Sequence, residues 1–127
     1  MDKTTLVNID VSLGDEVVKA LDAAGIEANV ALWVWLSEYE DWRLVLASRR
    51  LDKEGLRRSY ELVNRATDTA GIAINRAPSI LILKMTDPFI RELRRIFGKA
   101  TSVNGVRLGG QSIGNRFVEE GYVYRIA

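Results

Sequence analysis

Arginine is the residue type in this sequence that is best suited to binding a ligand. Guanidinium groups match the paired oxygens of phosphates and carboxylates. After residue 90, basic side chains recur at helical intervals, so they share one surface of a helix. This pattern predicts a surface that binds an anion or a nucleic acid. Its residues are Arg91, Arg94, Arg95 and Lys99, with support from Arg57 and Arg58 of the preceding helix.

The charge of the chain is divided unevenly along its length. Residues 1–48 contain three basic and nine acidic residues, a balance of −6, whereas residues 49–127 contain fifteen basic and eight acidic residues, a balance of +7. This division indicates either an anion-binding face or two halves that attract each other within a fold or an oligomer. Glu92 and the acidic first part could therefore neutralise the basic surface, and no helix-turn-helix or aromatic RNA-binding motif is present.

The sequence contains no histidine and no cysteine, which removes the commonest general base, transition-metal ligand and thiolate nucleophile. No serine lies in a Gly-x-Ser-x-Gly turn. The glycine-rich stretch 109–116 has Asn115 where a phosphate-binding loop needs lysine, so it is read as turns. The sequence therefore predicts no cofactor, no catalytic residue and no metal ligand.

Carboxylates remain as the second chemical candidate. Glu38, Glu40 and Asp41 cluster in the short link 37–41, and oxygen-rich clusters can hold Mg²⁺ or Ca²⁺. A solvated, charged turn is the commoner role for such a cluster. A metal-dependent phosphoesterase that uses these three residues is one alternative hypothesis.

Length and composition indicate one domain spanning residues 1–127. The chain is 47% hydrophobic and 28% charged, which is ordinary for a soluble globular protein. The start of the sequence shows no secretory signal, and the longest apolar run, 30–36, is too short to span a bilayer. The absence of cysteine suits a reducing compartment. A cytoplasmic protein without a membrane partner is expected.

The stretch 30–51 organises the expected fold, because it holds all three tryptophans in two short apolar runs joined by an acidic link. Such runs predict a β-hairpin. A link centred between Tyr39 and Glu40 pairs Trp35 with Leu44 and Trp33 with Leu46. Both faces are apolar, so the hairpin is expected at the centre of a sheet, covered on each side. One face gathers Trp33, Trp35, Trp42, Leu44 and Leu46, and the other Val30, Leu32, Val34, Leu36 and Val45, with Arg43 near its end.

Helices and further strands are expected around this hairpin. Residues 1–11 are read as an N-terminal arm or edge strand. Ser12 is read as the cap of a first helix over 13–24, and Asp52 as the cap of a second helix ending at Gly71. Asp87-Pro88 begins a third helix that Gly98 ends. A strand over 79–85 pairs parallel with the hairpin, and short antiparallel strands with four turns follow residue 103.

The order α-β-β-α-β-α-β-β predicts an α+β domain whose mixed sheet is built around the central hairpin. Within the second helix, Leu56, Tyr60, Val63, Thr67 and Ala70 are expected to face inward. On the solvent side, Glu61 and Arg65 are expected to form an i,i+4 pair.

Several segments resemble a pattern found in small bacterial proteins of unassigned function. The resemblance covers most of the chain and implies no activity, cofactor or site residue. It is carried by Ala31-Leu32-Trp33, Trp42-Arg43-Leu44-Val45, Ala47-Ser48, Leu51-Asp52, Asp87-Pro88 with the arginine-rich helix after it, and Gly121-Tyr122-Val123-Tyr124-Arg125.

The first hypothesis for function is a non-enzymatic interaction module that binds another macromolecule or itself, with a homodimer as one form. It rests on the missing catalytic side chains, the two-sided hairpin and the divided charge. Binding of a nucleic acid or another anionic partner through the arginine-rich third helix is the first alternative, and the phosphoesterase is the second.

Overall fold

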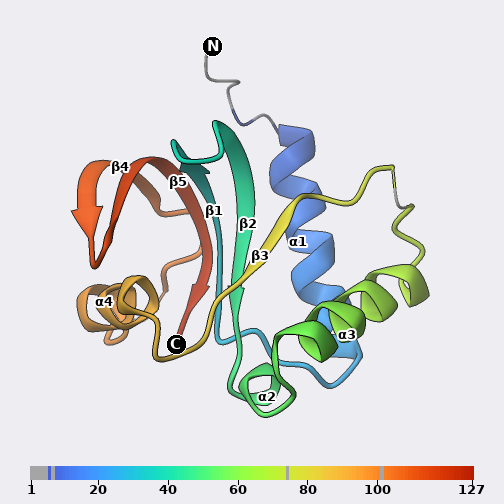
Figure 1. Cartoon of the computed structure of the whole chain (residues 1–127). Helices are drawn as coiled ribbons and strands as arrows, with labels where there is room; N and C mark the ends of the chain where they lie inside the picture. Colours follow the sequence, from blue (N-terminus) through green and yellow to red (C-terminus); the bar gives the residue numbers. More distant parts are fainter. Residues whose placement is uncertain (1–5, 7, 74, 101) are drawn as a thin grey trace.

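The expected hairpin lies at the centre of a five-stranded sheet in the computed structural model of the chain (Figure 1). The structure describes residues 6, 8–73, 75–100 and 102–127. The strand order is β3-β2-β1-β5-β4, so the two hairpin strands are flanked on both sides. The strands are β1 (Val30–Leu36), β2 (Asp41–Ala47), β3 (Ile80–Ile82), β4 (Arg107–Ile113) and β5 (Arg116–Ile126).

Helices cover both faces of this sheet (Figure 1). On one face lie α1 (Asn8–Ala23) and α3 (Leu56–Thr69), which follows the short α2 (Arg49–Asp52); on the other lies α4 (Pro88–Phe97). β3 pairs parallel with β2 after the α3 crossover, and the other pairs are antiparallel. The predicted α+β domain with a mixed sheet around the hairpin is confirmed.

The hairpin register differs from the expected one by two residues. Trp35 pairs with Trp42 and Trp33 with Leu44, because the link is the four-residue segment 37–40, in which Glu40 has a φ of 49°. Side chains alternate with a period of two, so this shift leaves every side chain on its expected face. The tryptophans lie in the core beneath α1 and α3, and Val30, Leu32, Val34 and Leu36 lie in the core beneath α4.

The first helix begins earlier than its sequence pattern suggests. α1 starts at Asn8, so Ser12 lies inside the helix and the predicted arm or strand is wrong for residues 8–11. The rest of the expected arm lies outside the described residues, apart from the buried Leu6. Side chains of the sheet hydrogen-bond to carbonyls of this first turn, which stabilises helix where β-branched residues indicated a strand.

The second helical region is divided in two. Ser48 caps α2 with hydrogen bonds from Arg50 N and Leu51 N, at 3.1 and 3.3 Å, so Asp52 is not a helix cap. α3 then begins after Gly55. Several inward positions are as expected, but Leu56 is 61% exposed and Ala70 is exposed too, because each lies at an end of the helix.

In the last third of the chain the helix is as expected, but the tail forms two long strands where several short ones were expected. Asp87 caps α4 by accepting from Phe89 N at 2.9 Å, and Gly98 ends the helix, as predicted. Only Gly114-Asn115 forms a turn within the tail hairpin, whereas Gly109-Gly110 and Glu119–Gly121 lie inside β4 and β5. The tail is therefore one long hairpin, whose second strand pairs with β1.

Candidate functional site

The predicted basic surface lies on α4, where the apolar stripe positions it. Phe89, Ile90 and Leu93 are fully buried against the sheet, so the arginines between them point toward solvent. Arg91 and Arg95 are exposed and Arg94 is half-buried. The acidic α1 covers the opposite face of the sheet and does not reach this helix (Figure 1).

Two of the four cations on this surface are already engaged. Arg95 hydrogen-bonds Glu92 one turn earlier, and this bond holds the pKa of the Glu92 carboxyl below its usual range. Arg94 Nε donates to the Ala127 carbonyl oxygen at 3.0 Å. Among the described residues, Arg91 and Lys99 have no ion pair or side-chain hydrogen bond.

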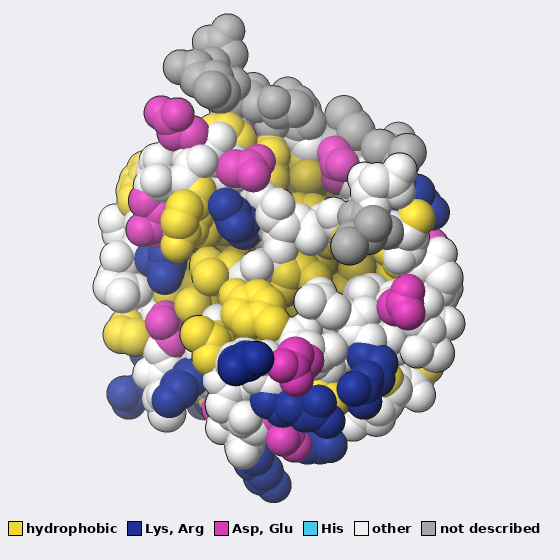
Figure 2. All heavy atoms as spheres, turned by 45° about the vertical axis from the view of Figure 1, so that its right-hand side comes forward, with side chains coloured by type: hydrophobic (Ala, Val, Ile, Leu, Met, Phe, Trp, Pro, Cys, Tyr) yellow, Lys and Arg dark blue, Asp and Glu magenta, His cyan; other side chains and the backbone are white. Residues whose placement is uncertain are grey.

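Arg57 and Arg58 do not extend this surface, because α3 lies on the other side of the sheet. Both arginines pair with Glu61 of their own helix, at 3.5 and 3.4 Å, so the predicted Glu61–Arg65 pair is replaced. Figure 2 shows Lys and Arg side chains on the lower part of this face with acidic side chains among them. The six predicted residues therefore form two separate groups.

The acidic link does not gather its carboxylates into one site. Glu38 pairs with Arg116 of the neighbouring β4–β5 hairpin, and Asp41 Oδ1 accepts from Trp42 N at 2.8 Å. In the part of the chain that the structure describes, no group of three or more carboxylates is placed to hold a metal ion.

The fold brings acidic residues of the first part of the sequence into contact with basic residues of the later part. Acidic residues of the first 48 positions form ion pairs with arginines of the later part. The best formed of these is a two-pronged pair in which Arg125 donates to Asp22 of α1 at 3.1 and 3.0 Å. This hydrogen bond raises the pKa of the Arg125 guanidinium. The other two pairs are Glu16 with Arg76 and Glu38 with Arg116.

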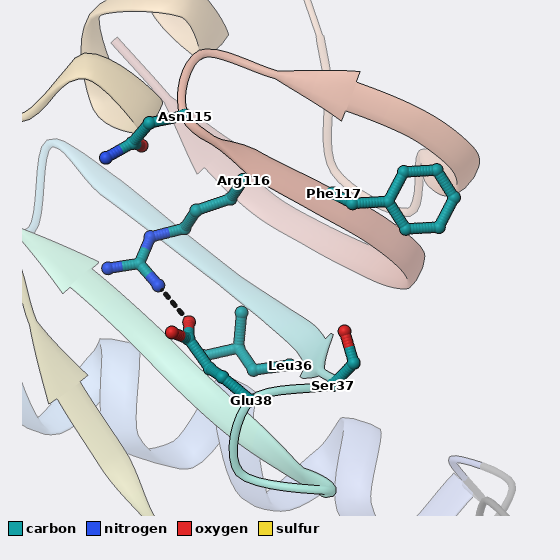
Figure 3. A pocket seen from close by; sticks show the side chains of 6 residues that line it. All are labelled: Leu36, Ser37, Glu38, Asn115, Arg116 and Phe117. Carbon is teal, nitrogen blue, oxygen red and sulfur yellow. Dashed lines mark hydrogen bonds and ion pairs between the residues drawn. The ribbon is translucent and has the colours of Figure 1, made fainter.

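A polar hollow of about 300 Å³ lies where the two hairpins meet. The β1–β2 link supplies Ser37 and Glu38 after Leu36, and the β4–β5 turn supplies Asn115 followed by Arg116 and Phe117. Figure 3 shows the Arg116 side chain reaching across to Glu38, while the Phe117 ring points away. The Arg116 side chain is 19% exposed and that of Glu38 is 55% exposed, and Arg116 Nε is buried with no hydrogen-bond partner among the described residues.

The two outer edges of the sheet differ in how they meet solvent. β3 is three residues long, and side chains cover its outer side: Tyr60 Oη accepts from Ile82 N at 3.0 Å, and Asp52 Oδ2 accepts from Met85 N at 3.1 Å just beyond it. β4 is seven residues long, and its run 109–112, whose residues are exposed, pairs with β5 on one side and has no strand of the described residues on its outer side. One edge is therefore closed and the other is open.

Sequence reasoning missed both the hollow and the open edge. Arg116 follows a Gly-Asn turn, which is a usable signal for a side chain at a hairpin end, but its partner Glu38 is 78 residues away. The open edge was hidden because Gly109-Gly110 was read as a turn. In the structure Gly110 has a φ of 59° and the pairing register is unchanged on either side of it.

Comparisons with protein-family models, curated proteins and solved structures find no match to this chain. The resemblance to small bacterial proteins therefore stays a prediction. Among the described residues, no helix has the length and apolar character needed to cross a membrane.

Proposed function

We propose that this chain is a non-enzymatic interaction module that pairs with a second copy of itself through the outer edge of β4. The observation that carries the proposal is the difference between the two edges of the sheet. Tyr60 and Asp52 occupy backbone donors at the β3 edge, whereas run 109–112 of β4 is exposed. Unpaired strand edges offer a ready template for another strand.

A second copy suits this edge because of its symmetry and charge. A two-fold axis near Gly110 sets two β4 strands antiparallel, so each strand pairs with itself. β4 has one charged residue, Arg107 at its start. Antiparallel pairing puts the two copies of Arg107 at opposite ends of the shared ladder, roughly 20 Å apart at about 3.4 Å per residue. The pairing therefore brings no like charges together.

Sedimentation velocity over a range of protein concentrations tests the proposal. The expected result is a reversible shift from monomer to dimer as concentration rises. Ser112→Lys should weaken this dimer at least tenfold, because a lysine on the open edge lies beside the partner copy's basic strand end and opposes pairing. Ser79→Lys is the matched control, since it places the same charge next to the closed edge. A monomer at every concentration, or equal effects of both variants, would refute the proposal.

Anion binding through α4 is the second candidate, favoured by the exposed Arg91 and Lys99, which form no ion pair or side-chain hydrogen bond with the described residues. Binding of a labelled DNA duplex and a single strand, followed by anisotropy at several salt concentrations, tests it. The double variant Arg91→Gln/Lys99→Gln should lower affinity and reduce the salt slope by about 2, because each phosphate contact contributes about 0.9. Arg57→Gln/Arg58→Gln changes the same charge on the other face and should bind like the wild type. No binding at low salt would exclude this candidate.

A further inference from the structure

We propose that Arg116 is the binding residue for a ligand carboxylate, and that Glu38 occupies the ligand's position in this structure. The proposal concerns the hollow where the two hairpins meet and is independent of pairing through β4. Its chemistry is visible in place, because a carboxylate already contacts the guanidinium there (Figure 3). Guanidinium and carboxylate groups match each other through two parallel N–H···O bonds.

The arginine is more buried than its partner and lies in a strand, whereas its partner lies in a turn. Arg116 is the first residue of β5 and pairs with the fully buried Ile113, and its side chain is only 19% exposed. Glu38 belongs to the four-residue link of the other hairpin, and its side chain is 55% exposed. Displacing the glutamate therefore exposes a positioned guanidinium without disturbing either hairpin.

Most N–H donors of the Arg116 guanidinium also have no acceptor among the described residues. An arginine has five N–H donors, and the one acceptor that the described residues offer to Arg116 is the Glu38 carboxylate. Its Nε–H is buried and bonds to nothing in the described part of the chain. A buried donor without an acceptor is unfavourable. A ligand carboxylate that accepts two parallel N–H···O bonds would provide acceptors for guanidinium donors that Glu38 leaves without a hydrogen bond.

The walls of the hollow indicate the rest of the ligand. Ser37 and Asn115 add a hydroxyl and an amide to the lining of the hollow. Leu36 and Phe117 are its apolar residues, although the Phe117 ring points away from Arg116 (Figure 3). Because Glu38 stays nearby after it is displaced, a singly charged carboxylate is favoured over a doubly charged phosphate. The expected ligand is a carboxylate with an apolar body, either a small acid or an acidic side chain of a peptide.

Glu38 then acts as a tethered competitor, since a group on a short link has an effective concentration in about the millimolar range. Glu38→Gln should increase the affinity for a free carboxylate at least tenfold over the wild type. Glu40→Gln is the matched control, because it removes the same charge from the same link at a residue that does not pair with Arg116. Arg116→Lys keeps the positive charge but loses the fork, and it should lose the binding.

Two probes distinguish the source of the carboxylate: phenylacetate, and an acetylated glycine peptide with one internal glutamate. Titration of each into the folded full chain is followed by NMR, using the Arg116 side-chain N–H and the amides of Asn115 and Phe117. Saturable chemical-shift changes support the site if the affinity that they report increases in Glu38→Gln and stays unchanged in Glu40→Gln. The tighter probe shows whether a small acid or a peptide is preferred, and phenylacetamide should not bind.

Equal affinities of Glu38→Gln and Glu40→Gln would overturn the proposal, as would binding of phenylacetamide. The absence of shifts with either probe in Glu38→Gln would overturn it as well. Thermal unfolding shows whether each variant is folded. If Arg116→Lys does not fold, the comparison of the two glutamate variants still decides the result, because both retain the arginine.

Discussion

The two covered faces of the sheet are held to their helices in different ways. Beneath α1, polar atoms of large aromatic side chains bond to the helix backbone: Trp33 Nε1 donates to Asp10 O at 3.2 Å, and Tyr124 Oη donates to Val11 O at 2.5 Å. Beneath α4, the contact consists of buried apolar side chains around Phe89. The face beneath α1 therefore combines packing with hydrogen bonds to the helix backbone, whereas the face beneath α4 is held mainly by packing.

A glycine permits close approach on each face. In α1, a Cβ on Gly14 would lie 2.3 Å from Tyr124 Oη, which is the end of a side chain. In the β4–β5 turn, a Cβ on Gly114 would lie 2.5 Å from the Pro88 carbonyl oxygen, which belongs to the backbone at the start of α4. A side-chain end can move aside more readily than backbone. The comparison therefore predicts different tolerance to the same added methyl group.

The largest expected effect on stability is at the face of the sheet that α4 covers. Phe89→Ala removes a side chain that is 0% exposed and leaves a cavity between α4 and the sheet. The free energy of unfolding should fall by about 3–5 kcal/mol. Urea denaturation followed by tryptophan fluorescence measures this change. Phe97→Ala, at the half-buried end of the same helix, should cost distinctly less; equal costs would show that Phe89 does not anchor α4.

Gly114→Ala should destabilise the fold by about 2–4 kcal/mol, from the strain of a positive φ together with the backbone contact. Gly110→Ala is a close control, because its φ of 59° matches the 60° of Gly114 and no atom lies within 4 Å of its added Cβ. The difference between the two unfolding free energies isolates the contact with α4. A Gly110 variant that is equally destabilised would mean that φ strain alone acts.

Gly14→Ala should cost about 1–3 kcal/mol through overpacking against Tyr124 and Trp33. Tyr124→Phe removes the oxygen that the added methyl group meets. The double variant should therefore be less destabilised than the sum of the two single variants, and a double-mutant cycle of unfolding free energies measures this coupling. Strict additivity would place the strain elsewhere than at the Tyr124 hydroxyl.

The smallest expected effect concerns alkaline pH. Burial raises the pKa of the Tyr124 hydroxyl above its ordinary value, although the hydrogen bond from Trp33 opposes this. The folded state then keeps a proton that the unfolded state loses, so stability should fall above about pH 10, by at most about 1.4 kcal/mol per pH unit. Unfolding free energies at pH 9 and pH 11 measure this fall. Tyr124→Phe should lack this component, and an equal decline in both proteins would contradict it.

Much of this two-faced arrangement follows from local sequence patterns. The alternation in residues 30–36 and 42–46 identifies both faces correctly even though the pairing register was two residues off, because the side-chain period is also two. Asp87-Pro88 and Gly98 give the ends of α4 because a cap, a fixed φ and a helix stop are local effects.

Features that depend on distant contacts could not be predicted in this way. β5 carries an irregularity opposite Ala31 and Leu32, and Tyr124 is the extra residue in its pairing with β1. Such a bulge turns neighbouring side chains to the same face. Tyr124 bonds to α1 at Val11, and Arg125 bonds to it at Asp22. No spacing in the sequence indicates that pair of contacts.

Contacts between distant residues also limit what the sequence predicts about the candidate site. The exposure of Arg91 and Arg95 follows from the apolar stripe of α4, which can be read from the sequence. The engagement of Arg94 by Ala127 and of Arg116 by Glu38 joins positions 33 and 78 residues apart. Whether a basic side chain is free therefore depends on tertiary structure, and the sequence count of arginines overstated the available charge.

The closed edge at β3 has a consequence for assembly. A sheet with two open edges can add strands from both sides, so its copies can join into a growing fibre. In this chain the Tyr60 hydroxyl and the Asp52 carboxylate occupy backbone donors at one end of the sheet. The proposed pairing through β4 would occupy the other edge of the sheet in both copies at once. Two molecules would therefore form a continuous sheet of ten strands with a capped strand at each end, and polymerisation would stop there.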